Sequence, residues 1–155
     1  MKGRKPGSDN VVPMTGDVRL ESFEAAARSK AGQLKPAHLN GGAGEVWDRL
    51  APILCLPTVD RLQPQMVESC SLMCQALARY EGLRGKLADP EFGETYESHT
   101  RNGVQFKSRP EVAQMNEAFR QFLTLARDFG LTPAAERGLK NAGQGRLPFD
   151  EGDFD

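Results

Sequence analysis

The stretch from Ser108 to Lys140 constrains the fold more than any other part of the chain, because it has the pattern of two helices joined by a short junction. Between Pro110 and Asp128, apolar side chains recur at three- and four-residue spacing, which places them on one face of a helix with polar side chains opposite. They are Val112, Met115, Phe119, Phe122, Leu123 and Ala126. This pattern predicts an amphipathic helix that packs against the rest of the protein.

The junction from Phe129 to Pro133 combines one signal that ends a helix with two that start one. Gly130 can adopt the left-handed backbone conformation that closes a helix C-terminus. Thr132 can accept a hydrogen bond from the free amides of the next helix, and Pro133 suits its first turn. We therefore expect one helix to end and another to begin within this junction.

Two further helices are predicted nearer the N-terminus. In residues 44–56, Trp47 lies among apolar residues at helical spacing, and Pro52 should bend or break the helix. The longest helix is expected over residues 60–87, where Asp60 and Gln63 match a capping box.

The apolar residues of segment 60–87 cover about 200° of the helix circumference, which is more than a small monomer can bury. We therefore expect part of this surface to contact a second copy of the chain. The candidate interface residues are Leu72, Leu83 and Leu87.

A short β-hairpin is predicted between the last two long helices. Residues 96–99 and 104–108 flank the sequence Arg101-Asn102-Gly103, in which Asn-Gly is the preferred pair of a two-residue turn. A lone hairpin is only marginally stable in water, so it should pack on the helices or pair with a neighbour's hairpin. Its cations, Arg101, Lys107 and Arg109, form either a basic surface for a phosphate backbone or the solvated side of an exposed hairpin.

The two ends of the chain carry opposite charge. Residues 1–40 contain seven Lys/Arg and four Asp/Glu, whereas residues 141–155 contain one Arg and four acidic residues. We interpret residues 1–40 as a flexible basic arm and linker with a weak helix over 18–30, and residues 141–155 as a disordered acidic tail. Either end can contact a partner or be merely solvated.

These patterns together predict a mainly α fold. A core of three to four helices over residues 41–140 carries the hairpin, at about 94–108, and flexible termini. Three Cys, an odd number, and the lack of an apolar leader or a membrane-spanning run predict a soluble intracellular protein in a reducing compartment.

The sequence offers no catalytic motif, and it lacks the Gly-rich phosphate loop of nucleotide hydrolases. Cys70 and Cys74 lie one helical turn apart and could share a metal with His99, but such a pair on an apolar helix face is more typical of buried core thiols. The carboxylates are scattered rather than paired as a metal-dependent nuclease requires. We expect no enzymatic activity, no cofactor and no metal site.

Three separated motifs carry a family resemblance. They are Gly3-Arg4-Lys5-Pro6; Pro36-Ala37-His38-Leu39 followed by Trp47-Asp48-Arg49-Leu50-Ala51-Pro52; and the junction Gly130-Leu131-Thr132-Pro133. In this order they resemble the P27-type small terminase subunits of tailed bacteriophages. The family's Ser-Ser-Arg after the junction is replaced here by Ala134-Ala135-Glu136-Arg137, so a phosphate contact by that arginine is not carried over.

The resemblance implies a non-catalytic, homo-oligomeric ring in phage genome packaging. Such a ring binds viral double-stranded DNA and delivers it to the large terminase subunit, an ATPase and nuclease, in the host-cell cytoplasm and without a membrane partner. On this interpretation the DNA contacts are Lys2, Arg4 and Lys5 with Arg101, Lys107 and Arg109. The large-subunit contact is assigned to Leu147, Phe149 and Phe154 in the acidic tail.

An alternative is a small helical DNA-binding transcription regulator, with residues 131–140 as its recognition helix. Few residues of that segment can read bases, and Gly138 interrupts it. A scaffolding or adaptor protein that binds only other proteins is a third possibility. A closed ring would favour the terminase interpretation, and a dimer would favour the regulator.

Overall fold

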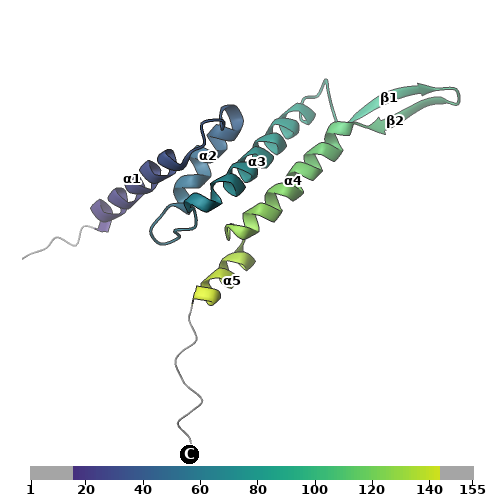
Figure 1. Cartoon of the computed structure of the whole chain (residues 1–155). Helices are drawn as coiled ribbons and strands as arrows, with labels where there is room; N and C mark the ends of the chain where they lie inside the picture. The colour runs from purple at the N-terminus through teal and green to yellow at the C-terminus, as the bar shows by residue number, and fades with distance from the viewer. Residues whose placement is uncertain (1–15, 144–155) are drawn as a thin grey trace, which may run out of the picture.

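The computed structural model describes residues 16–143, which form five α-helices, one 3-10 turn and a two-stranded antiparallel hairpin (Figure 1). In chain order the elements are α1 (Gly16–Leu34), α2 (Gly41–Leu54), η2 (Pro64–Met66), α3 (Val67–Leu87), β1 (Thr95–Thr100), β2 (Gly103–Ser108), α4 (Pro110–Asp128) and α5 (Pro133–Gly143). This mainly helical architecture with a single hairpin among the described residues confirms the predicted fold class.

The segment expected to be a flexible linker contains α1. It is helical over residues 16–34 rather than 18–30, and Ala27 and Ala31 are buried where it packs on α2. The indole Nε1 of Trp47 donates a hydrogen bond to the carbonyl oxygen of Ala31 over 3.1 Å. The small alanines let the two helices approach closely, and this kind of contact leaves little trace in hydrophobic periodicity. Trp47 is fully buried, as predicted for a core anchor.

Pro52 does not divide α2, because it lies in the last turn and the helix ends two residues later at Leu54. A proline in that position removes only one hydrogen bond near an end whose carbonyls are already short of partners. The break expected at Pro52 is therefore not found within α2, and the proline instead lies just before the end of the helix.

The predicted capping box at Asp60 is wrong. The chain remains in a loop until η2, and α3 begins at Val67. Asp60 has a φ of +41°, a left-handed conformation that does not fit an N-cap, and Gln63 donates to its carbonyl oxygen over 3.3 Å. The Asp60 carboxylate instead accepts a hydrogen bond from Lys30 Nζ at 2.7 Å, which lowers the pKa of Asp60. This exposed ion pair connects α1 to the loop.

The hydrophobic core lies around α3, which packs against α2 on one side and against its antiparallel neighbour α4 on the other (Figure 1). Ala27 and Ala31 of α1 extend this core over α2. Its fully buried large side chains are Val46, Trp47, Leu54, Leu62, Cys70, Met73, Cys74 and Phe129. None of the helices in residues 16–143 is long and apolar enough to cross a membrane.

The junction between α4 and α5 forms as the sequence predicts. Gly130 has a φ of +66°, its amide donates to the Arg127 carbonyl at 2.9 Å, and the amide of Leu131 donates to the Ala126 carbonyl at 2.9 Å. These two hydrogen bonds close the end of α4 as a Schellman motif. The Thr132 hydroxyl oxygen accepts from the Ala135 amide at 3.4 Å and so caps α5.

A partly buried contact that the sequence did not predict completes the junction. Arg61, from the loop before α3, donates from one guanidinium nitrogen to the carbonyl oxygens of Phe129 and Gly130, at 3.0 and 3.1 Å. The side chain of Arg61 packs directly over Gly130, where a β-carbon would lie 2.7 Å from Arg61 Cζ. Only glycine fits this position, for both its backbone conformation and its lack of a side chain.

We expect Gly130→Ala to lower the free energy of unfolding by about 3 kcal/mol, because alanine is strained at positive φ and would displace Arg61 from two carbonyl oxygens. The matched control is Gly85→Ala in α3, where an added β-carbon meets no atom within 4 Å. That variant should gain up to about 1 kcal/mol from helix propensity. Urea denaturation of both variants checks the prediction, which fails if they differ by less than experimental error.

Candidate nucleic-acid interface

The β1–β2 hairpin extends away from the helices at the end of the α3–α4 pair (Figure 1). Its register pairs Thr95 with Ser108 and Thr100 with Gly103, and every strand residue is exposed except Ser98, which is half-buried. We expected the hairpin either to pack on the helices or to pair with a neighbour's hairpin, and its strands do not pack on any helix that the structure describes.

The turn of the hairpin differs from the expected one by one residue. Its two loop residues are Arg101 and Asn102, neither of which has a positive φ, whereas Gly103 has a φ of +110° and begins β2. Asn-Gly therefore does not fill the two central turn positions. The Thr100 hydroxyl donates to the Gly103 carbonyl at 2.9 Å and closes this tip.

Arg109 fixes the base of the hairpin. Its amide donates to the Glu94 carbonyl at 2.9 Å and its Nε donates to the Phe92 carbonyl at 2.9 Å. The guanidinium carbon also lies 3.9 Å from the centre of the Phe92 ring and 5.7 Å from that of Tyr96. Because a desolvated cation over an aromatic face is stabilising, these contacts hold the hairpin at a fixed angle to α4.

A second cation reinforces the same base from α3. Lys86 Nζ lies 4.4 Å from the centre of the Phe92 ring and donates to the Glu111 carboxylate at 3.0 Å. This hydrogen bond lowers the pKa of Glu111. The cluster of Lys86, Phe92, Arg109 and Glu111, which we call the hairpin base, therefore joins α3 to the start of α4.

The predicted DNA-contacting cations divide into three groups. Arg101 at the tip and Lys107 on β2 are exposed and have no ion-pair partner among the side chains of residues 20–139. Arg109 is half-buried in the hairpin base, where it positions the hairpin, and its contact with DNA stays a prediction. The arm residues Lys2, Arg4 and Lys5 lie outside the described residues, as do the tail residues Leu147, Phe149 and Phe154.

The predicted interface leucines also differ in their exposure. Leu72 is 55 % exposed on α3, and Leu83 is half-buried. Leu87 is only 6 % exposed and lines a hollow of its own subunit together with Tyr80 and Met115. This burial removes Leu87 from the surface available to a second copy.

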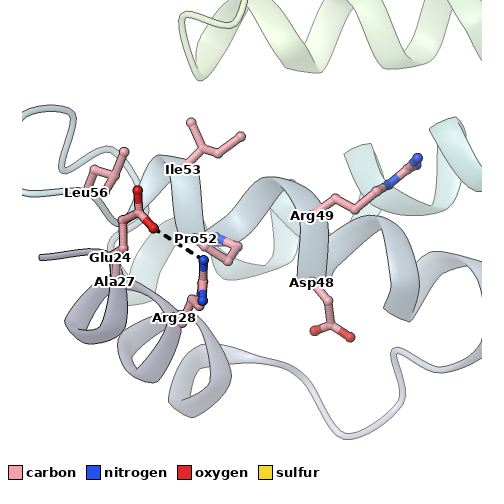
Figure 2. Close-up of a pocket in the computed structure, with 8 residues that line it drawn as sticks. All are labelled: Glu24, Ala27, Arg28, Asp48, Arg49, Pro52, Ile53 and Leu56. Atoms are coloured by element: carbon pink, nitrogen blue, oxygen red, sulfur yellow. Dashed lines mark hydrogen bonds and ion pairs between the residues drawn. The ribbon is translucent and has the colours of Figure 1, made fainter. Parts of the chain in front are cut away.

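A hollow between α1 and α2 is lined by Glu24, Ala27, Arg28, Asp48, Arg49, Pro52, Ile53 and Leu56 (Figure 2). All of its charged side chains have partners: Arg28 pairs with Glu24 inside the hollow, while Asp48 pairs with Lys35 and Arg49 with Glu81 outside it. The hollow thus presents neither a free nucleophile nor a free cation, and we assign it no chemistry.

The cysteines are core residues. Cys55, Cys70 and Cys74 are free and buried, and the contact with Cys74 together with burial raises the pKa of the Cys70 thiol. Within residues 16–143 no group of three or more His, Cys, Asp or Glu side chains is placed to hold a metal ion. His99 lies on the exposed hairpin, away from the buried thiols.

The most exposed large apolar side chain of the hairpin was not singled out from the sequence. Phe106 is 72 % exposed on β2, and Val104 on the same face is 53 % exposed. Period-two alternation shows that such residues share a face, but it does not show whether a helix covers that face.

The comparisons with known proteins give one family. A family model described as "Phage terminase, small subunit" matches residues 43–146, which is more than half of the chain. The matched range begins at the third residue of α2 and includes α3, the hairpin, α4 and α5. No curated protein and no solved structure gives a significant match to the chain.

We expect Arg109→Ala to accelerate amide hydrogen exchange in the hairpin by roughly 30-fold, since it removes a charged hydrogen bond and a cation–π contact worth about 2 kcal/mol together. Arg127→Ala, an exposed arginine at the far end of α4, is the matched control and should leave hairpin exchange unchanged. Equal protection of the hairpin in both variants would contradict the assigned role of Arg109.

Proposed function

Because this chain belongs to the family of phage terminase small subunits, it has a role in phage genome packaging, and we propose that it binds viral double-stranded DNA and delivers it to the large terminase subunit. The observation that carries the proposal is the family match across the helical core and the hairpin. We further propose that the protein acts as a non-catalytic homo-oligomeric ring of the P27 type in the host-cell cytoplasm.

The exposed cations of the hairpin support a DNA contact there. Ion pairs engage six cations of the helices and the loops between them, whereas Arg79, Arg84 and Arg127 have none among the described residues. The six are Arg28, Lys30, Lys35, Arg49, Lys86 and Arg120. Arg101 and Lys107 have no such carboxylate partner among the described residues, so they can exchange counterions for phosphates without first breaking an ion pair. Arg109 contributes by holding the hairpin that carries them.

The basic N-terminal segment extends the same proposal to a part of the chain outside the described residues. Lys2, Arg4 and Lys5 lie near the start of the chain, where each cation would add a weak and salt-sensitive contact to DNA. In a ring, the same few contacts are repeated by every subunit. Repetition multiplies weak binding through effective concentration, which is why a small number of cations per subunit suffices.

The acidic C-terminal segment is the proposed contact with the large subunit. Leu147, Phe149 and Phe154 are interleaved with four carboxylates, a composition typical of segments that dock into a basic groove of a partner. Carboxylates at that end of the chain also disfavour a DNA contact there.

We expect the double variant Arg101→Ala/Lys107→Ala to weaken DNA binding and to reduce the slope of log K against log salt concentration by about 2 per bound subunit. Fluorescence anisotropy with duplex DNA at several salt concentrations measures this slope. The control is Arg28→Gln/Arg120→Gln, which removes the same charge from two arginines that already pair with carboxylates. An unchanged slope in the hairpin variant, or an equal change in the control, would contradict the hairpin contact.

We expect the triple variant Leu147→Ala/Phe149→Ala/Phe154→Ala to abolish stimulation of the large subunit's ATPase, because aromatic and apolar anchors contribute most of the binding energy in small interfaces. DNA binding by the same variant should be unchanged, since no cation is removed. If the variant stimulates the ATPase as strongly as the wild-type protein does at the same concentration, the large-subunit contact lies elsewhere on the chain.

A further inference from the structure

One face of the hairpin is apolar and uncovered. Phe106 and Val104 point to the same face, where the register places Glu97 opposite Phe106 and His99 opposite Val104. Phe106 is 72 % exposed, and none of the described helices packs on this face. An isolated two-stranded sheet is marginally stable, and an exposed phenylalanine at its centre adds a hydrophobic cost in water. This surface, which we call the Phe106 face, lacks a partner among the described residues of its own subunit.

A complementary groove lies on the α3–α4 pair. Leu72, Gln75, Ala76 and Arg79 recur along α3 at helical spacing, and Gln121 and Leu125 of α4 form the other wall. Leu72 is exposed, and Arg79 has no ion-pair partner among the described residues. We call this surface the Leu72 groove. It combines the apolar side chains of Leu72, Ala76 and Leu125 with the cation of Arg79.

We propose that the Phe106 face of one copy docks in the Leu72 groove of a neighbouring copy, with Phe106 against Leu72 and Leu125 and with Glu97 paired to Arg79. The two surfaces match in polarity, because each has an exposed apolar side chain, Phe106 or Leu72, and a charge of opposite sign, Glu97 or Arg79, that forms no ion pair with another described side chain. The inference rests on the proposed self-assembly of the chain and names the surfaces that produce it.

The chemistry of the Phe106 face favours a protein partner over DNA. The Glu97 carboxylate beside Phe106 would repel a phosphate backbone, whereas Lys107 projects from the opposite face of the same strand. The hairpin can therefore contact DNA with one face and a neighbouring copy with the other.

Two different surfaces in contact also determine the kind of assembly. A contact in which a patch meets a different patch on the next copy is heterologous, so an open assembly keeps one free groove at one end and one free hairpin at the other for further copies. Such a contact closes into a ring when the rotation per copy is a whole fraction of a turn. It does not stop at a dimer, as a self-complementary patch would.

Sedimentation velocity of the full chain across a concentration series tests the apolar part of the proposed contact, in which Phe106 meets Leu72 and Leu125. We expect Phe106→Ala to weaken assembly about 30-fold or more, as loss of an aromatic anchor does. Gln105→Ala is the matched control, since Gln105 immediately precedes Phe106 on β2 and faces the opposite side, so that its loss should leave assembly unchanged. Unchanged assembly of Phe106→Ala overturns the inference.

Reversing the charges of Glu97 and Arg79 tests whether the hairpin docks in the Leu72 groove, and it leaves the apolar side chains of both surfaces unchanged. Glu97→Arg and Arg79→Glu should each weaken assembly about 5- to 10-fold, and the double variant should recover to within about threefold of the wild type. Failure of the double variant to recover would show that Glu97 and Arg79 do not meet and would overturn the docking site. Circular dichroism of each variant reports whether its helices remain folded.

The outcomes separate this inference from the proposed function. A wild-type chain that remains monomeric at all concentrations overturns both the ring and the docking site. A wild-type ring that is insensitive to Phe106→Ala and to the charge reversals overturns the docking site alone and leaves the DNA-delivery function in place.

Discussion

The arrangement of the long helices depends on arginines that bind main-chain carbonyl oxygens where the helices end. At one end of the α3–α4 pair, Arg61 donates to the carbonyl oxygens of Phe129 and Gly130. At the other end, Arg109 donates to the carbonyl oxygen of Phe92. Helix ends and loops leave carbonyl groups without intrahelical partners, and a guanidinium has enough donors to satisfy several of them at once. The pair is thereby held at both ends, while its apolar side chains fill the space between.

Local chemistry explains which parts of this fold could be predicted from the sequence. The α4–α5 junction follows from Gly130, Thr132 and Pro133 alone, because each residue acts on its nearest neighbours. The long helices follow from apolar spacing, and Trp47 is a natural core anchor. The hairpin was also predictable, although its turn is shifted by one residue because Gly103 pairs with Thr100 instead of occupying the turn.

The contacts that escaped prediction join residues far apart in the chain. Arg61 and Phe129 are 68 residues apart, and Lys30 and Asp60 are 30 apart. No local pattern distinguishes such an arginine or aspartate from a solvated one. Arg109 illustrates the same limit within the candidate site: it has the same charge as Arg101, but only the three-dimensional position of Phe92 shows that it belongs to the hairpin base. Family membership supplied the functional assignment that residue chemistry did not.

The alternation of side chains along β2 limits how this strand can change during evolution. Phe106 and Lys107 are adjacent in sequence but lie on opposite faces. Inserting or deleting a single residue before them would reverse both faces, so that the cation would point where the aromatic ring was and the ring where the cation was. Changes of two residues would preserve the faces and alter only the reach of the hairpin. Length variation among related hairpins of this kind should therefore occur in even steps.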